Sequence, residues 1–326
     1  MQSVLVIGGG GYVGSQLVPK LLSAGYKVLV FDTFWYGKSH FSAHPHLDLI
    51  QADMRDTNAV ADAMKNQDVV IHLACISNDP SFDLNPMLGK SVNLDSFLPI
   101  VKIAKISSIH HFIYASSSSV YGIKDDERVT ENLSLEPLTD YSRFKVACED
   151  MLLNEVSDEF TTTIIRPATI CGVSTRQRFD LVVNILAANA IENRIIKVFG
   201  GTQFRPNLHI EDMADAYLAI LQSDKSVINK EIFNVGGKNL TVSEIAESVQ
   251  RVIDSNIPIE FQETQDMRSY RVDSTKIFKT IGFTPKRGID DAIADIKEAY
   301  VNKAFFNVLK NPNYINILRM KELNLG

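Results

Sequence analysis

A tyrosine and a lysine one helical turn apart are the residues of this chain best suited to acid–base chemistry. Tyr141 and Lys145 lie in Asp140–Val156, which we predict to be a helix, so both side chains share one face. A phenol is a poor base at neutral pH because its pKa is about 10, but a neighbouring ammonium favours the phenolate. Such a pair can remove a proton from an alcohol while the alcohol carbon transfers a hydride. This spacing is common on helices, so the interpretation depends on its surroundings.

Four consecutive serines, Ser116–Ser119, precede this helix. They come after the predicted strand His111–Ala115 and lead into Val120-Tyr121-Gly122. A serine hydroxyl close to the tyrosine would hold the same substrate oxygen. The end of a parallel strand is also where doubly wound proteins bind their ligands.

A glycine cluster near the N-terminus indicates where a dinucleotide would bind. Gly8, Gly11 and Gly14 are spaced three apart, directly after the apolar strand Val4–Ile7 and before a helical pattern. Gly8 permits a tight turn, Gly11 lets the backbone approach a pyrophosphate, and Gly14 lets the helix pack close to the strand. The start of the helix offers free N–H groups to the phosphates. The alternative interpretation is a plain flexible turn.

The nature of the dinucleotide is indicated by the end of the next strand. Lys27–Phe31 ends at Asp32, about 20 residues after the glycines, as the dinucleotide fingerprint requires. A carboxylate there accepts hydrogen bonds from the adenosine ribose and repels a 2′-phosphate, which favours NAD over NADP. The alternative is a strand-end aspartate that caps a turn.

Strands and helices alternate through the first half of the chain. This alternation predicts an α/β fold of the Rossmann type with a doubly wound parallel sheet. The expected strands are Val4–Ile7, Lys27–Phe31, Leu47–Gln51, Asp68–Leu73, His111–Ala115 and Thr161–Arg166, and the expected helices are Tyr12–Ala24, Asn58–Lys65, Pro86–Ser107 and Asp140–Val156.

After Pro167 the alternation is replaced by helices mixed with short strands. The expected helices are Leu181–Ala190, His209–Gln222, Thr241–Ile253 and Asp290–Lys303, and the expected strands are Ile196–Phe199, Glu231–Val235 and Ile257–Phe261. We therefore predict an NAD-binding domain over residues 1–167 and a smaller C-terminal α/β substrate lobe over residues 168–326, interleaved at the boundary.

Composition excludes several classes of protein. With 326 residues, 45% hydrophobic and 22% charged, the chain is typical of globular proteins. Its net charge of −6 argues against a nucleic-acid or anionic-membrane surface. We expect no transmembrane helix and no signal peptide, because no apolar run is long enough and the N-terminus begins with a strand. The scattered cysteines fit reduced thiols in the cytoplasm, and the polar loop with His40, His44 and His46 lacks a metal-binding pattern.

Taken together, these motifs resemble the extended short-chain dehydrogenases/reductases of the NAD-dependent epimerase/dehydratase family, which act on nucleotide sugars. The resemblance covers roughly residues 1–215 and extends more weakly towards residue 290. The motifs are Gly8 to Gly14, Asp32, Asp53-Met54, His72-Leu73-Ala74, Ser116 to Gly122, Tyr141 to Lys145, Arg166-Pro167, Arg205 to Asp212 and the weaker Asp266 to Tyr270.

The resemblance implies a role for each matching position. Ser117 and Tyr141 would be catalytic, with Lys145 as the modulator of the tyrosine and a ligand of the nicotinamide ribose. The implied cofactor-binding residues are Gly8, Gly11, Tyr12, Val13, Gly14, Asp32, Asp53, Met54, Leu73, Ala74, Cys75, Tyr141, Lys145 and Pro167. The implied substrate-binding residues are Asn93, Ser118, Thr169, Asn184, Arg205 and Arg268.

Some of these positions keep a second interpretation. Thr169 stands where many family members have Asn, and Arg268 could be an exposed loop cation. Cys75 and Cys171 could lie near the site or act as small buried hydrophobes. Arg205 and Arg268 suit a diphosphate because a guanidinium is a bidentate partner for phosphate oxygens.

The two residues directly after Ser117 limit the classes of reaction that the chain could catalyse. Family dehydratases and decarboxylases have acidic residues there, whereas this chain has Ser118 and Ser119, which cannot easily act as general acid or base. A 4,6-dehydratase is therefore disfavoured. We expect oxidation of the sugar C4 hydroxyl to a ketone by a C4 epimerase or C4 dehydrogenase. A nucleotide-4-ketosugar reductase is the alternative, and an NAD-binding sensor or scaffold is the non-enzyme alternative.

The expected partner is a nucleotide-diphosphate sugar, with NAD as cofactor, no metal, no nucleic acid and no membrane. Pro86–Ser107 and Asp140–Val156 are rich in apolar residues and could pair with their copies in a homodimer.

Overall fold

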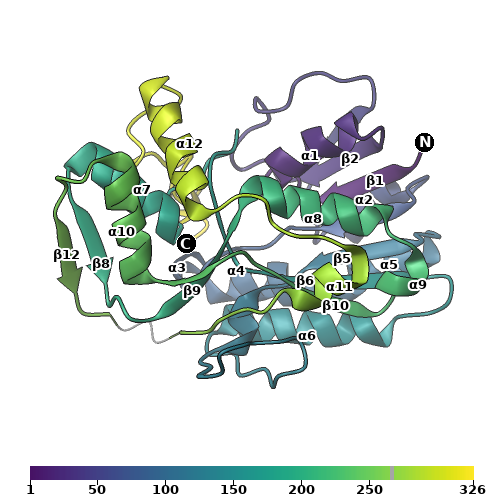
Figure 1. Ribbon diagram of the computed structural model, residues 1–326. Helices are drawn as coiled ribbons and strands as arrows, with labels where there is room; N and C mark the ends of the chain where they lie inside the picture. Colours follow the sequence, from purple (N-terminus) through teal and green to yellow (C-terminus); the bar gives the residue numbers. More distant parts are fainter. Residues whose placement is uncertain (265–267) are drawn as a thin grey trace.

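A seven-stranded sheet forms the centre of the computed structural model, which describes residues 1–264 and 268–326. Its strand order is β10-β6-β5-β4-β1-β2-β3, and all neighbouring strands are parallel (Figure 1). The strands are β1 (Ser3–Ile7), β2 (Lys27–Asp32), β3 (Leu47–Gln51), β4 (Val69–His72), β5 (His111–Ala115), β6 (Thr161–Pro167) and β10 (Glu231–Val235). This arrangement confirms the predicted Rossmann-type fold.

Helices cover both faces of the sheet, as the continuous apolar strands require. The helices α1 (Gly14–Ser23) and α8 (Ile210–Gln222) cover one face, and α2 (Thr57–Met64), α5 (Phe97–Ile106) and α6 (Asp140–Asn154) cover the other (Figure 1). Side chains of β1 alternate between the two cores, with Val4 and Val6 in the first and Leu5 and Ile7 in the second. Each such buried side chain contributes about 1.5–3 kcal/mol.

A second, smaller lobe is built around its own hydrophobic core. The helices α7 (Val182–Asn193), α10 (Val242–Ile253) and α12 (Ile289–Val301) pack with the parallel pair β8 (Ile196–Phe199) and β12 (Ile259–Gln262). A three-stranded sheet of β7 (Thr169–Cys171), β9 (Phe204–His209) and β11 (Asn239–Thr241) connects this lobe to the main sheet. In Figure 1 the lobe lies beyond one end of the main sheet.

The main sheet recruits a strand from beyond residue 167. We placed Glu231–Val235 with the elements of the substrate lobe, but β10 pairs in parallel with β6, in the register Ile232 to Ile164. The helix α8 likewise packs on α1 rather than in the lobe. The chain therefore returns to the main sheet after leaving it, and local strand propensity could not reveal this long-range pairing.

The predicted long helix Pro86–Ser107 is interrupted. It consists of α4 (Pro86–Lys90), a π-helical turn η1 (Ser91–Asp95) and α5. Asn93 lies on the π-turn, and its amide binds both the backbone N–H and the C=O of Ile76, at 2.8 and 2.9 Å. The apolar periodicity did not distinguish this arrangement from one continuous α-helix.

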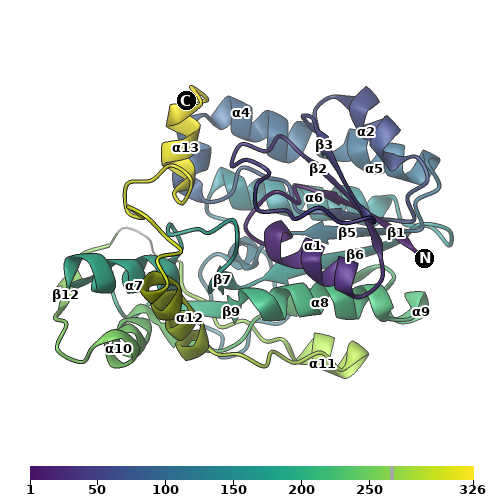
Figure 2. The same cartoon turned by 90° about the horizontal axis from the view of Figure 1, so that it is seen from above.

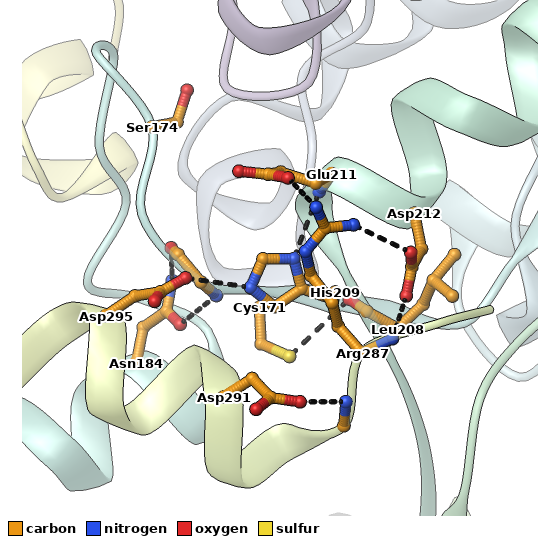
Figure 3. Close-up of polar contacts among 12 residues, drawn as sticks. Cys171, Ser174, Asn184, Leu208, His209, Glu211, Asp212, Arg287, Asp291 and Asp295 are labelled. Atoms are coloured by element: carbon orange, nitrogen blue, oxygen red, sulfur yellow. Dashed lines mark hydrogen bonds and ion pairs between the residues drawn. The ribbon is translucent and has the colours of Figure 1, made fainter.

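A cluster of charged side chains connects the second lobe to α8. Asp212, which is 1% exposed, accepts hydrogen bonds from the backbone of Lys286 and Arg287 and from the Arg287 guanidinium. His209 precedes α8, accepts from the Glu211 amide and contacts Asp295 of α12 at 3.1 Å (Figure 3). The buried charge of Asp212 is thus paired, which fixes α12 against the sheet.

The C-terminal segment crosses back from α12 to the NAD-binding half. It ends in α13 (Asn316–Glu322), which packs against α3 (Asp79–Leu84) and lies close to α4 (Figure 2). The remaining short elements are η2 (Ser118–Tyr121), α9 (Lys225–Ile228) and α11 (Thr275–Ile281). Asp266 and Met267, part of the weaker sequence resemblance, lie outside the described residues.

Candidate active site

A cavity of about 650 Å³ opens at the carboxyl ends of the main strands and extends to the second lobe. Its wall includes the glycine loop, the ends of β2, β4 and β5, the loop after β7, and α13. This is the position at which doubly wound sheets bind their ligands.

The glycine loop leaves no room for side chains at two positions. A Cβ on Gly8, whose φ is +85°, would lie 2.4 Å from the backbone nitrogen of Ala74. A Cβ on Gly14, at the start of α1, would lie 2.3 Å from the Gly9 carbonyl oxygen. The tasks predicted for both glycines match this packing. At Gly11 a Cβ would meet only the Gly8 oxygen, at 3.3 Å, and Gly11 lines the cavity.

Asp32 lies at the end of β2 and turns its carboxylate towards the glycine loop. Its two oxygens accept from the backbone N–H groups of Gly10, at 2.9 Å, and Phe34, at 2.8 Å. Burial raises the pKa of Asp32 above its usual value, and these two hydrogen bonds offset part of that rise. Asp53 also lines the cavity, and the hydrogen bond from Arg55 lowers the pKa of Asp53. Both carboxylates therefore lie at the wall of the cavity.

Tyr141 and Ser117 meet at the cavity wall. Tyr141 comes from the first turn of α6, which is capped by Thr139, and Ser117 precedes η2 and caps it by accepting from the Ser119 amide. Burial raises the pKa of Tyr141 well above its usual value, and the nearby Ser117 hydroxyl offsets part of this rise. The predicted catalytic tyrosine and serine are thus brought together.

Lys145 lies one turn after Tyr141 on α6, and its ammonium binds the end of β5. Its ammonium donates to the Ala115 carbonyl at 2.6 Å and lies 5.8 Å from the ring centre of Tyr141 and 4.9 Å from that of Tyr114. We expected this ammonium to lower the pKa of Tyr141, but burial dominates and raises it. Lys145 is itself only 4% exposed.

A buried ion pair supports the serine loop from below. Glu149 on α6 and Arg166 on β6 are 2% and 3% exposed and form a bidentate contact, with 2.6 Å between Arg166 Nη2 and Glu149 Oε2. Glu149 also accepts from the Ser116 hydroxyl, and Arg166 donates to the Tyr121 hydroxyl at 2.9 Å. These bonds connect α6, β6 and the serine loop, so Tyr141 and Ser117 rest on one rigid frame.

Most of the other predicted residues line the cavity. These are Tyr12, Val13, Met54, Leu73, Ala74, Cys75, Ser118, Pro167, Thr169, Arg205 and Arg268. Cys171 is fully buried and contacts the Leu208 carbonyl, which matches the interpretation as a small core residue.

Asn93 and Asn184 do not face the cavity, although we predicted both as substrate ligands. Asn93 is committed to the backbone of Ile76. Asn184, fully buried on α7, accepts from the Gly172 amide at 3.0 Å and donates to the Tyr12 hydroxyl and the Arg178 carbonyl. Both amides therefore shape the wall of the cavity, and all their hydrogen-bonding groups point into the protein.

Two buried arginines were missed at the sequence level. Arg176 and Arg178 are 5% and 8% exposed, line the cavity, and each keeps one buried nitrogen, Nε and Nη2 respectively, without a hydrogen-bond partner. Arg178 is paired with Asp180, and Arg176 lies over the ring of Tyr36 at 3.4 Å, with its pKa lowered to about 10 by burial. In the sequence the two arginines stand in a mostly polar stretch, and no spacing connects them to the glycine loop.

An acidic residue opposite the arginines was also missed. Asp79, at the start of α3, forms an ion pair with Arg268 at 2.6 Å, and its second oxygen is buried without a partner. Besides burial, the charge of Asp79 raises the pKa of Tyr141, so Asp79 lies close enough to influence this phenol.

The residues present fit a dinucleotide. The glycine cradle excludes side chains, and the start of α1 faces the cavity. The two arginines offer unpaired N–H groups that can donate hydrogen bonds to pyrophosphate oxygens.

Among the described residues, no group of three His, Cys, Asp or Glu side chains could hold a metal ion. Within the same residues, we find no helix with the length and apolar character needed to span a membrane.

Fold and site together define a dinucleotide-binding enzyme of the Rossmann type with a buried tyrosine at the cavity wall. A family model, the NAD dependent epimerase/dehydratase family, matches residues 4–236. The chain belongs to this family, which confirms the resemblance deduced from its motifs, and its cofactor is NAD.

Curated relatives and solved structures agree with this membership. The chain is 28% identical to UDP-glucose 4-epimerase of Lactobacillus helveticus, over 89% of this chain and 94% of the relative. It is 27% identical to a putative UDP-glucose 4-epimerase of Methanocaldococcus jannaschii, over 95% and 99%. Its fold resembles that of the UDP-glucuronic acid 4-epimerase of Bacillus cereus, which was solved with UDP-glucuronic acid and NAD. The TM-score is 0.84 at 24% sequence identity, and the match covers 93% of this chain and 100% of that one.

Proposed function

We propose that this protein is an NAD-dependent C4 epimerase of a nucleotide-diphosphate sugar. The observation that carries the proposal is that Tyr141 and Ser117 both lie at the wall of a cavity that continues from the glycine loop to Arg205 and Arg268. The relatives named as epimerases support the same reaction.

The chain's own residues account for the proton transfer. Ser117 holds the C4 oxygen of the sugar by a hydrogen bond, and Tyr141 exchanges the proton of that hydroxyl as the C4 ketone forms and is reduced again. Bound NAD would supply reversible hydride transfer at C4. Burial of Tyr141 raises its pKa and favours the neutral phenol, so this hydroxyl carries its proton at neutral pH.

Side chains beyond the catalytic pair support an epimerase over a dehydratase. Ser118 and Ser119 are 2% and 6% exposed, and Ser118 donates to the Tyr270 hydroxyl at 3.4 Å. Neither hydroxyl is a general acid or base suited to removing water from the ketosugar. A C4 dehydrogenase, which releases the ketone, is the second candidate, since the same first step serves both.

We propose that the nucleotide sugar binds between the two halves of the chain. Residues 1–167 would contribute the NAD site, and residues 168–326 would contribute most of the nucleotide-sugar site. Arg205 and Arg268 line this part of the cavity and would contact the diphosphate. Thr169 and Ser118 also line the cavity and would contact the sugar.

A cytoplasmic homodimer is part of the proposal. The helices α5 and α6 lie side by side on one face, and Ile106 at the end of α5 is 82% exposed. An apolar surface on adjacent helices suits pairing with a second copy. A monomer by light scattering at micromolar concentration would contradict this part.

The reaction is tested on purified protein in two steps. Bound cofactor and its redox state are first identified, and UDP-, GDP-, CDP- and dTDP-sugars are then screened by absorbance and product mass. Retained NAD with unchanged product mass indicates an epimerase, whereas accumulation of NADH with loss of two hydrogens indicates a dehydrogenase. Loss of water would indicate a dehydratase and contradict the proposal.

Tyr141→Phe tests the mechanism itself. This variant should retain NAD and lose turnover by a factor of about 10² to 10⁴, because it removes only the proton-transferring oxygen. Tyr26→Phe, at a partly buried tyrosine that does not line the cavity, is the matched control. Full activity of Tyr141→Phe would refute the mechanism. Cofactor binding without activity towards any sugar nucleotide would favour the sensor or scaffold.

A further inference from the structure

Asn316 joins four segments of the chain at one end of the cavity. Its side-chain oxygen accepts from Arg176 Nη2 at 2.7 Å and from the Tyr36 hydroxyl at 2.9 Å. Its amide nitrogen donates to the Ser77 hydroxyl at 3.0 Å, and its backbone N–H donates to Asp180 at 3.1 Å. Asn316 is 7% exposed, so these bonds are shielded from water.

The partners of Asn316 belong to the dinucleotide end of the cavity. Tyr36 comes after β2 and Asp32, Ser77 after β4, and Arg176 after β7. Each of these loops lines the cavity, and Arg176 carries one of the nitrogens that lack a partner. A single side chain from the C-terminus therefore fixes the relative positions of three cofactor-facing loops.

The helix that carries Asn316 is itself part of the wall. Ile317 and Met320 of α13 line the cavity. Outside the cavity, Arg319 donates to the Trp35 carbonyl, and the Asn85 amide donates to the Leu325 carbonyl at 3.0 Å. In Figure 2 the C-terminal segment runs from the second lobe across to α13 beside α4. The chain thus closes over its own cavity.

We propose that α13 is a clamp that keeps NAD bound through the catalytic cycle, and that Asn316 is the positioning residue that holds it shut. This inference deepens the proposed function and rests on it, since an epimerase returns the hydride to the same substrate and needs no cofactor exchange. A dehydrogenase must release its reduced cofactor after each turnover. Release requires the clamp to open, so the stability of the α13 contacts sets the rate of exchange.

The test measures cofactor exchange rather than activity. The full-length protein is loaded with NAD and diluted into excess isotopically labelled NAD, and the bound fraction is followed by mass. Wild type should exchange NAD more slowly than it turns over substrate. Asn316→Ala should exchange on the order of 10- to 100-fold faster, the effect of losing one to two net hydrogen bonds. Trp35, the single tryptophan of the chain, lines the cavity and gives a fluorescence signal for the same event.

Two further variants keep the result interpretable. Asn313→Ala, at an exposed asparagine on the same tail, should exchange like wild type. Arg319→Ala loosens α13 from the Trp35 carbonyl without altering a cavity-lining residue and should also accelerate exchange, even if Asn316→Ala does not fold.

Two results would overturn the clamp. One is a wild-type exchange rate above the turnover rate, and the other is unchanged exchange when α13 is loosened by Arg319→Ala. Either result would leave the proposed chemistry intact, because that depends on turnover and product mass. A protein that holds NAD tightly but converts no sugar nucleotide would instead refute the proposed function.

Discussion

The ammonium of Lys145 donates to the carbonyl oxygen of Ala115 at 2.6 Å, across the boundary between α6 and the end of β5. Ser116 and Ser117 come directly after Ala115, and Tyr141 lies one turn before Lys145 on the same helix. This bond therefore links the helix that carries Tyr141 to the strand that leads into Ser117. Lys145 acts as a positioning residue in this arrangement as well as a positive charge near the phenol.

Lys145→Met should separate these two contributions. Loss of the bond to Ala115 should lower kcat by a factor of about 10² or more, since small misplacements of reacting groups carry such penalties. Because burial already raises the pKa of Tyr141, the rate in the oxidative direction should increase with pH, and the increase should persist in the variant. The pH profile of kcat/KM checks this. An unchanged kcat would contradict the positioning role, and Lys102→Met, at an exposed lysine on α5, is the control.

Gly8→Ala should abolish NAD binding. The added Cβ would lie 2.4 Å from the Ala74 nitrogen, and the residue would keep a φ of +85°, so the loop must move. Gly25→Ala has a similar φ of +88° with nothing within 4 Å, so it should cost only about 1–2 kcal/mol and leave NAD binding intact. Calorimetric titration of both variants with NAD checks the difference. Equal effects would mean that backbone strain, and not the close approach, explains Gly8.

Glu149→Gln should destabilise the protein by about 3–5 kcal/mol, because it leaves the buried Arg166 without its counter-ion. The exposed pair Arg251 and Asp290, with side chains 61% and 51% exposed, gives the matched control. Arg251→Met should cost less than about 1 kcal/mol. Urea unfolding measures both values. A small effect at Glu149 would show that the pair is replaceable and that the serine loop is held by other contacts.

The stability of the fold should fall with acidification in a way that depends on His72. This side chain is 3% exposed among Phe97, Phe112 and Tyr114, and burial, together with the charge of Lys145, lowers its pKa to about 3. The unfolded chain binds the proton at its ordinary pKa of about 6.5. The contribution of neutral His72 to the free energy of unfolding is therefore fully present above that pH, and it is lost as the pH falls towards 3.

His72→Leu should remove about 2 kcal/mol of the stability difference between pH 7.5 and pH 5, as expected for a group that is protonated only when unfolded. Urea unfolding at the two pH values gives the measurement. His44→Leu, at an exposed histidine, should leave the difference unchanged. The prediction fails if both variants retain the full pH dependence.

Local features of the sequence were sufficient for the centre of the site. The glycine spacing, Asp32 and the Tyr141 pattern each depend on residues within about 20 positions, and the fold brings all three to the same cavity. The same reasoning failed where a side chain forms hydrogen bonds with a segment that is distant in the sequence. Asn184 binds Tyr12, 172 residues away in the sequence, so its exposure could not be judged from its neighbours.

Long-range pairing also explains what was missed. Arg176 owes its role to Tyr36 and Asn316, two residues that lie far from it in sequence and on opposite sides. The position of β10 depends on the register with β6, and a five-residue apolar strand carries no information about its partner. The hydrogen bond from Lys145 to the end of β5 likewise joins residues 30 positions apart, which the spacing on the helix could not indicate.

The place of β10 at the edge of the main sheet has a consequence for synthesis of the chain. Because β10 is the last strand added, a ribosome that has released only the first 167 residues presents β6 as an unpaired edge with buried-type side chains. Open edges of this kind recruit other strands and promote aggregation. A nascent chain of this protein should therefore need chaperone protection until residue 235 has emerged, and expression of the N-terminal half alone should give insoluble material.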